Sequence, residues 1–358
     1  MEDQEKHKQD LLQLLRSSVT HKASDLHISP GQPPVMRING QLTRMTEFPV
    51  YDANATQQLI CSALDKVQQN VFDTHLELDF SILLPDVGGF RANIFHQQNG
   101  ISGVFRVVPM DIPNLEALGT PPIVKEILDL SSGLILVTGP TGCGKSTTLA
   151  GMIDYINTNQ QSHIITVEDP IEFIHHSKKS LVHQRQIFRD SSSFSAALRS
   201  ALREDPDVIL VGEMRDLETI RLALTAAETG HLVLGTLHTS SAPRAISRVI
   251  DAFPADEKNV IRNLISESLQ AVITQALLNK IEGGRVAAYE IMLGTPAIRN
   301  LIREDKTAQM YSVMQTSAKM GMCTMEQSLS DLVAKNITTR ESAHESGFQR
   351  EMFESTIR

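Results

Sequence analysis

Hydrophobic and polar positions divide the chain into two parts with different patterns. In the first third, apolar residues at helical spacing (Leu11, Leu15 and Val19) precede strands that alternate, as in residues 76–84. After about residue 122, short continuous apolar runs alternate with helical patterns instead. Alternating strands are typical of an antiparallel sheet with one solvated face, whereas continuous apolar strands are typical of a parallel sheet that is covered on both faces. The pattern therefore predicts two domains of different architecture.

The first part predicts a small α+β domain. A short apolar strand leads into Asn39 and Gly40, a pair that strongly favours a hairpin turn. The next apolar residues, over 59–67, have the spacing of one helix. Later strands place Arg91 and Arg106 on the face opposite their apolar neighbours. Both arginines are therefore expected on the polar side of a half-buried sheet.

Prolines mark the boundary between the two parts. Four of them lie between residues 109 and 122, where neither a continuous helix nor a central strand can run. We expect a first domain over residues 1–110, a linker over 111–122 and a second domain over 123–358. Apolar runs in the second domain predict buried strands at residues 134–137, 164–167, 208–211 and 232–237. Strands of this kind between helices indicate an α/β domain with a mostly parallel sheet.

A glycine-rich loop follows the first of these strands. Residues 139–146 match the pattern G-x-x-x-x-G-K-[ST], and an amphipathic helix pattern begins directly after them. In this setting backbone N–H groups surround phosphates, Lys145 reaches the β- and γ-phosphate oxygens, and Ser146 binds Mg²⁺. The sequence thus predicts a site for ATP with Mg²⁺. The expected nucleotide contacts in this loop are Gly139, Pro140, Thr141, Gly142, Cys143, Gly144, Lys145, Ser146 and Thr147.

Cys143 allows two interpretations. A helix N-terminus and a neighbouring lysine are the surroundings that lower a thiol pKa and make it reactive. A small residue that fits the loop is the simpler interpretation, and we prefer it.

Carboxylates follow two of the predicted strands. Residues 208–213 resemble a Walker B strand, which we expect beside the loop strand, with Glu213 near the metal. Gly212 stands where many P-loop enzymes have an Mg²⁺-binding aspartate, so Glu213 is expected to act through metal-bound water. Glu168 ends another strand, at the sheet edge where ligands bind, and is our candidate to orient or deprotonate the attacking water. Carboxylates also collect at solvated strand ends, so position alone does not decide the role of Glu168.

Two histidines and two arginines complete the candidate site. His231 and His238 lie at opposite ends of the strand over 232–237, where a histidine is more often structural, and neither has a second metal ligand nearby. The alternative is that His238 senses the γ-phosphate and His231 contacts the nucleotide. Arg91 and Arg106 are either solvated surface or the positive groups that neutralise charge on the γ-phosphate. In the second case, closure of one domain onto the other is the mechanical step.

Composition and charge narrow the class of function. The 358-residue chain has a net charge of −9 and only 4% aromatic residues. Nucleic-acid translocases can share this fold, but they use basic grooves and aromatic stacking, so we expect no nucleic-acid partner. Three cysteines are too few for a disulfide framework, and no apolar stretch is long enough to span a membrane. We therefore expect a cytoplasmic protein.

Four motifs in order resemble the secretion ATPases of type II secretion and type IV pili. They lie at residues 139–146, 167–172, 211–216 and 229–239, and the resemblance spans nearly the whole chain. It implies a PAS-like first domain, a RecA-like second domain and ATP with Mg²⁺. It also implies a homohexameric ring that docks on an inner-membrane platform protein, at the inner face of the membrane at the pilus base. A paralogous accessory ATPase is a further partner that the resemblance allows.

Residues 294–304 resemble a motif of the retraction branch of that family. They predict a helix capped by Thr295, with Ile298, Leu301 and Ile302 buried; the residues expected to point outward are Arg299, Asn300, Arg303 and Glu304. Extension and secretion relatives generally carry a longer N-terminal region and a tetracysteine zinc element, and this sequence has neither. We therefore predict a motor for pilus retraction. The alternatives are an extension or secretion ATPase and a nucleotide-dependent regulator with slow turnover.

Overall fold

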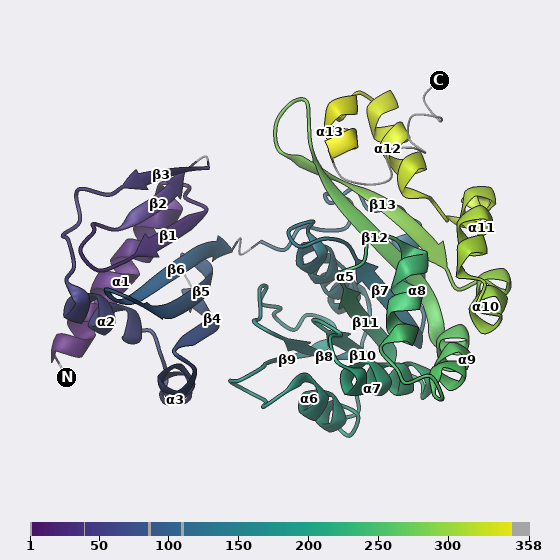
Figure 1. The fold of residues 1–358 in the computed structure, drawn as a ribbon, viewed down its shortest axis with the longest axis horizontal. Helices are drawn as coiled ribbons and strands as arrows, with labels where there is room; N and C mark the ends of the chain where they lie inside the picture. Colours follow the sequence, from purple (N-terminus) through teal and green to yellow (C-terminus); the bar gives the residue numbers. More distant parts are fainter. Residues whose placement is uncertain (1, 39, 85–86, 109–110, 346–358) are drawn as a thin grey trace. The chain divides into compact units, whose positions relative to one another are not determined.

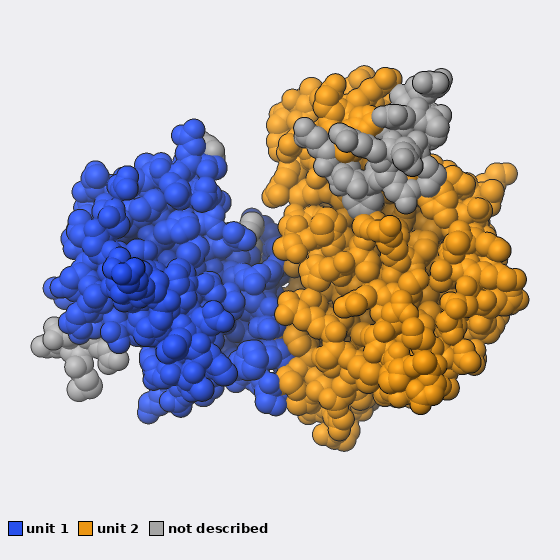
Figure 2. Space-filling view, in the orientation of Figure 1, with its two compact units in different colours: residues 1–111, 169–174, 185–192 blue, residues 112–168, 175–184, 193–358 orange. Residues whose placement is uncertain are grey.

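The chain forms two compact units, shown in different colours in Figure 2. The computed structural model describes residues 2–38, 40–84, 87–108 and 111–345. Unit 1 comprises residues 1–111, 169–174 and 185–192, and unit 2 comprises residues 112–168, 175–184 and 193–358. These limits differ from the expected ones, because two segments of the expected second domain cluster with unit 1 and residues 112–122 cluster with unit 2. Local composition marks a change of pattern but does not reveal such long-range contacts.

Unit 1 is built on a six-stranded sheet in the order β3-β2-β1-β6-β5-β4, in which neighbouring strands are antiparallel. Its core contains four fully buried phenylalanines, Phe72, Phe80, Phe90 and Phe105. The elements are α1 (Glu2–Thr20), β1 (Asp25–Ile28), β2 (Val35–Ile38), β3 (Gln41–Arg44), α2 (Ala53–Cys61), α3 (Lys66–His75), β4 (Glu77–Leu84), β5 (Gly88–Gln97) and β6 (Gly100–Val108).

Two local predictions for unit 1 had different outcomes. The predicted hairpin is confirmed by the pairing of β2 with β3, although Asn39 lies outside the described residues. The single helix expected over residues 59–67 is wrong, because α2 ends at Cys61 and α3 begins at Lys66. The Asp65 side chain accepts the backbone N–H of Gln68, whose own side chain accepts the Asp65 N–H. This capping box starts a new helix within the apolar pattern.

Unit 2 contains most of a seven-stranded sheet in the order β13-β12-β7-β11-β10-β8-β9 (Figure 1). The neighbours from β12 to β8 are parallel, and β13 is antiparallel to β12. The strands are β7 (Gly133–Thr138), β8 (His163–Glu168), β9 (Leu181–Gln186), β10 (Val208–Val211), β11 (Leu232–Leu237), β12 (Leu269–Asn279) and β13 (Arg285–Leu293). The helices are α4 (Ile123–Leu128), α5 (Lys145–Asn159), α6 (Phe194–Ala201), α7 (Leu217–Glu228), α8 (Ala242–Asp251), α9 (Lys258–Ser268), α10 (Pro296–Arg303), α11 (Met310–Thr316), α12 (Met325–Ala334) and α13 (Arg340–Glu345), with short 3-10 helices at Thr307–Gln309 and Ala318–Met320.

The sheet of unit 2 is buried on both faces, as its continuous apolar strands predict. Ile135 and Val137 of β7 join one core with residues of α4 and α5. Leu134 and Leu136, which point to the other face, join a second core with residues of α7 to α11. The predicted fold class, a RecA-like α/β domain preceded by a smaller α+β domain, is confirmed.

The order of the strands corrects one expectation. The Walker B strand, β10, is not beside the loop strand, because β11 lies between β7 and β10. Strand order depends on how each helix crosses the sheet, and no local pattern specifies it. The sequence also gave no prediction for β12 and β13, which form the long antiparallel pair at one edge.

The helix predicted within residues 294–304 is present as α10, with two differences, of which the first is that Leu301 is only half-buried. Thr295 caps its N-terminus by accepting the N–H of Ile298, which is fully buried. Arg299, expected to point outward, instead donates to the carbonyls of Ser266 at 3.0 Å and Leu269 at 2.9 Å. The end of α9 leaves these carbonyls without helical partners, and the guanidinium supplies the donors.

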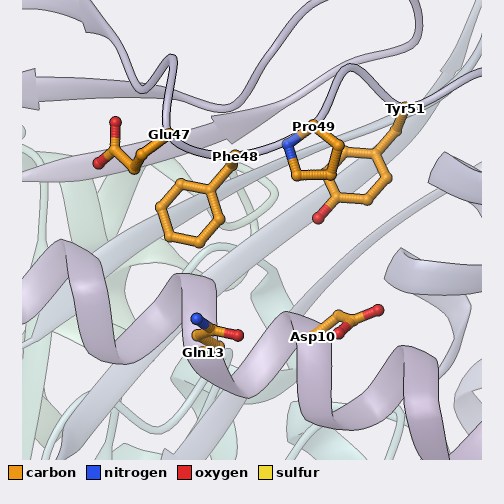
Figure 3. A pocket seen from close by; sticks show the side chains of 6 residues that line it. All are labelled: Asp10, Gln13, Glu47, Phe48, Pro49 and Tyr51. Carbon is orange, nitrogen blue, oxygen red and sulfur yellow. The ribbon is translucent and has the colours of Figure 1, made fainter.

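Unit 1 contains a cavity of about 440 Å³ beside α1. Figure 3 shows Asp10 and Gln13 on α1, facing a loop that carries Glu47, Phe48, Pro49 and Tyr51. None of these residues belongs to the predicted nucleotide site. Across the part of the chain that the structure describes, no helix combines the length and the apolar character that a membrane span requires.

Candidate nucleotide-binding site

The glycine-rich loop connects β7 to α5, and close packing explains two of its glycines. Gly139 has a φ of 141°, and a Cβ there would lie 2.4 Å from the carbonyl oxygen of Gln275. Gly144 has a φ of 92° and is the N-cap of α5. The first N–H groups of α5 lack helical partners, and together with the positive end of the helix dipole they favour an anion.

Lys145 lies across this loop. Its Nζ is 2.8 Å from the carbonyl oxygen of Gly139, 3.1 Å from that of Pro140 and 3.4 Å from Nδ1 of His238. An ammonium group can only donate, so Nδ1 of His238 must be the acceptor. The proton of neutral His238 is therefore on Nε2, which lies 3.1 Å from Oε1 of Glu213. His238 thus links the P-loop lysine to the carboxylate that follows β10.

Glu213 has two positive or donating neighbours. In addition to His238, Nε of Arg215 lies 2.6 Å from its carboxylate. Partial burial opposes ionisation, but Arg215 and His238 outweigh this effect and lower the pKa of Glu213 below its ordinary value. Glu213 is therefore a carboxylate at neutral pH.

Close packing also explains why residue 212 is a glycine. A Cβ at Gly212 would lie 3.1 Å from the carbonyl oxygen of Val167 and 3.2 Å from Cα of Glu168. The Gly212 N–H donates to the same Val167 carbonyl at 2.8 Å. An aspartate at this position would require the end of β8 to shift, so the packing favours glycine here.

Glu168 ends β8, and neutral donors make two of its hydrogen bonds. Its Oε1 accepts from Oγ1 of Thr166 at 2.6 Å and from Nε2 of Gln184 at 3.2 Å. Because β8 is three strands from β7 and strands are spaced at about 4.8 Å, Glu168 is roughly 14 Å along the sheet edge from the loop strand. It lies at the end of the sheet that was expected, separated from the loop strand by β11 and β10.

His231 is at the opposite end of the sheet, so its assignment as a nucleotide contact is wrong for the loop of its own chain. β11 and β7 are in parallel register, with Leu232 opposite Gly133 and Leu237 opposite Thr138. The two histidines that flank this strand are therefore roughly 20 Å apart at about 3.3 Å per residue. Nδ1 of His231 is 3.0 Å from the carbonyl oxygen of Ala226, a structural contact.

Arg91 and Arg106 are cross-strand neighbours on β5 and β6 of unit 1. Arg106 pairs with Asp25 at 2.9 Å, and Arg91 pairs with Glu172 at 3.3 Å. Burial opposes ionisation of Asp25, yet Ser24 and Arg106 lower its pKa. Both arginines therefore make ion pairs within unit 1, and their action on a nucleotide stays a prediction.

Cys143 fits the loop as a buried small residue. Burial raises the pKa of its thiol, and the nearby Lys145 ammonium only partly opposes this. Its side chain is 4% exposed. The thiol is therefore not activated, in agreement with the simpler of the two interpretations.

Gln275 is a residue of this site that sequence reasoning missed. It is buried on β12, and its side-chain amide contacts Thr148 at 2.8 Å and the Cys143 carbonyl at 2.7 Å. It lies 132 residues beyond Cys143 in the sequence, within a run that matches no motif. Only the pairing of β12 with β7 brings it to the loop.

The residues present fit Mg²⁺ bound together with a nucleotide. Among the residues described by the structure, no group of three or more His, Cys, Asp or Glu side chains is arranged to hold a metal ion. Ser146, in the first turn of α5, and the Glu213 carboxylate provide one hydroxyl and one anion. Mg²⁺ commonly takes few protein ligands and completes its shell with phosphate oxygens and water.

Known proteins that are similar to this chain belong to the family that its sequence motifs resemble. The family model described as "Type II/IV secretion system protein" matches residues 1–346. The type IV pilus retraction ATPase PilT of Pseudomonas aeruginosa is 56% identical over 94% of this chain and 97% of its own length. A twitching motility protein of Neisseria gonorrhoeae is 50% identical over 93% and 89% of the two chains. The crystal structure of the pilus retraction motor PilT with bound ADP matches with a TM-score of 0.89 and 46% identity, covering 96% of this chain and 98% of that one.

Proposed function

Because the chain belongs to the type II/IV secretion system protein family, we propose that it is a motor ATPase that drives retraction of type IV pili. The observation that supports ATP hydrolysis is the connection from Lys145 through His238 to Glu213 at the P-loop end of the sheet. The 56% identity with a retraction ATPase, over nearly the full length of both chains, supports the direction of movement.

Each residue of this site then has a task. Lys145 exchanges the Gly139 and Pro140 carbonyls for phosphate oxygens, and the loop N–H groups surround the same phosphates. Ser146, and Glu213 through metal-bound water, would hold Mg²⁺, and the bound ion would neutralise phosphate charge. Glu168, oriented by Thr166 and Gln184, positions or deprotonates the attacking water.

His238 is suited to report the state of the γ-phosphate. It contacts Lys145 on one side and Glu213 on the other, so a displacement of the lysine changes its hydrogen bonds directly. Arg91 and Arg106 supply further positive charge to the γ-phosphate when they are released from their acidic partners. The working form is a homohexamer in the cytoplasm, docked on an inner-membrane platform protein at the pilus base, with a paralogous ATPase as an accessory partner.

The test is deletion of the gene in the bacterium that carries it, followed by counting of surface pili and a twitching assay. Retraction predicts that pili accumulate and twitching stops, and that the wild-type gene restores both properties while Lys145→Ala does not. Loss of pili on deletion would contradict retraction and support an extension or secretion motor. Wild-type ATP turnover in purified Lys145→Ala would contradict the proposed site.

A further inference from the structure

We propose that Gln275 is a positioning residue that holds the phosphate-binding loop in shape from the neighbouring strand. The inference rests on the nucleotide site proposed above, because it concerns how that site is kept ready for phosphates. Gln275 is only 2% exposed, so its amide needs partners within the protein.

The amide of Gln275 joins two parts of the loop region. Nε2 donates to the Cys143 carbonyl at 2.7 Å, and Oε1 accepts from Oγ1 of Thr148 at 2.8 Å. Cys143 is in the middle of the loop and Thr148 is in the first turns of α5. One planar group therefore fixes the loop to the helix that follows it.

The bond to Cys143 matters because of the direction of that carbonyl. A loop that binds phosphate directs N–H groups inward, so the carbonyl oxygens of the same peptide units must find donors elsewhere. Nε2 of Gln275 is such a donor for the peptide unit whose N–H belongs to Gly144. Without this donor, rotation of the peptide would turn a carbonyl oxygen toward the phosphates.

Two glycines show how closely β12 approaches the loop. A Cβ at Gly139 would lie 2.4 Å from the main-chain oxygen of Gln275, and a Cβ at Gly144 would lie 2.9 Å from its Nε2. The glycines of the motif therefore serve this contact as well as the phosphates. Gln275 therefore lies close to both ends of the loop, at Gly139 and at Gly144.

The contacts around Gln275 extend to the neighbouring strand, β13. Tyr289 is opposite Gln275 in the β12–β13 pair, and its hydroxyl donates to the Leu118 carbonyl at 3.2 Å. Burial raises the pKa of Tyr289 to about 12, so the hydroxyl keeps its proton. A contact of Tyr289 with Thr148 partly opposes this rise, and it places Thr148 between Gln275 and Tyr289.

The experiment measures the Kd of fluorescent ADP and of ATP with Mg²⁺ for the full-length protein, together with kcat and KM. Gln275→Met keeps the length of the side chain and removes both hydrogen bonds. We expect both Kd values to rise about tenfold, which is the scale of one lost net hydrogen bond. Thr148→Val leaves the Cys143 bond intact and should raise Kd about threefold.

Two comparisons separate positioning from a general loss of stability. Gln270→Met is the matched control, because Gln270 is on the same strand and donates to the Ser132 carbonyl at 2.9 Å, at the end away from the loop. It should lower the Tm while leaving Kd within about twofold. The double variant Thr148→Val/Gln275→Met should bind no more weakly than Gln275→Met alone, because both bonds belong to one amide.

Wild-type affinity in folded Gln275→Met would overturn the proposal. If that variant does not fold, unchanged affinity in Thr148→Val overturns it instead. Failure of the wild-type protein to bind nucleotide would overturn the proposed function together with this inference, whereas equal binding by wild type and Gln275→Met overturns the inference alone.

Discussion

The two ends of the seven-stranded sheet use the same residue types for different purposes. At the P-loop end, side chains contact one another as well as the backbone, as in the connection of Lys145, His238 and Glu213. At the opposite end, His231 and Arg299 bind backbone carbonyls. The comparison teaches that the end of a strand, more than the type of residue, decides whether a polar group can take part in chemistry. In an open α/β sheet that end is the carboxyl end of the parallel strands.

The largest effect is expected from a substitution of Lys145. Lys145→Ala removes the charge that we propose faces the β- and γ-phosphates, so we expect ATP turnover to fall by about 10³-fold in a phosphate-release assay. Lys178→Ala is the control, because Lys178 is an exposed lysine of the same unit that pairs with Asp154 at 2.6 Å. Turnover in the control should stay at the wild-type level. A tenfold loss or less in Lys145→Ala would place the phosphate contact elsewhere.

A second prediction concerns Glu290, a buried polar group on the P-loop side of β13. Its carboxyl is 3% exposed and accepts the N–H groups at the starts of α8 and α12, from Ala242 at 2.6 Å and Met325 at 3.4 Å. Burial raises the pKa of Glu290 from 4.5 to about 7, although these two N–H groups oppose the shift. Glu326 is nearby and contributes to the rise.

The sign of its effect follows from this raised pKa. The stability contribution of Glu290 is fully present below pH 4.5 and is lost as the pH rises to 7. Between pH 5 and pH 8 we expect the wild-type free energy of unfolding to fall by about 2–3 kcal/mol more than that of Glu290→Gln. Urea unfolding at both pH values measures this difference. Glu282→Gln, an exposed control, should follow the wild type, and parallel profiles for Glu290→Gln would refute the prediction.

The third prediction compares the two histidines of β11 directly. His238→Ala breaks the link between Lys145 and Glu213, so we expect kcat to fall by about 10- to 100-fold. His231→Ala removes one structural hydrogen bond, so kcat should stay within about twofold and the free energy of unfolding should fall by about 1 kcal/mol. Steady-state kinetics and urea unfolding of both variants separate the two roles. Equal losses of kcat would show that the ends of the strand are not distinguished as proposed.

Much of this fold could be predicted from local patterns. The buried strands β7, β8, β10 and β11 follow from continuous apolar runs, and the loop at residues 139–146 follows from the spacing of its glycines and lysine. These signals are local, because burial on both faces and positive φ angles constrain the residues on the spot. The family motifs then indicate which ends of the strands carry chemistry.

The remaining features depend on contacts between distant segments. The sequence does not show that β11 lies between β7 and β10, or that Gln275 reaches Cys143, because these contacts join distant residues. Paired residues of β7 and β11 are 99 positions apart, and Gln275 is 132 positions from Cys143. The prediction that Arg299 points outward was wrong for a related reason. The helical pattern indicates which face of α10 carries Arg299, but the carbonyls that Arg299 binds belong to the end of another helix.

The smallest effect is expected at Arg299, at the end of the sheet opposite the P-loop. Arg299→Met keeps most of the apolar stem but removes the donors that satisfy carbonyls at the end of α9, among them that of Ser266 at 3.0 Å. We expect the free energy of unfolding to fall by about 1–2 kcal/mol, with basal ATP turnover unchanged. Asn300→Ala, an exposed neighbour on α10, should change stability by less than about 0.5 kcal/mol. Lost turnover at full stability in Arg299→Met would mean that this end of the sheet also contributes to the chemistry.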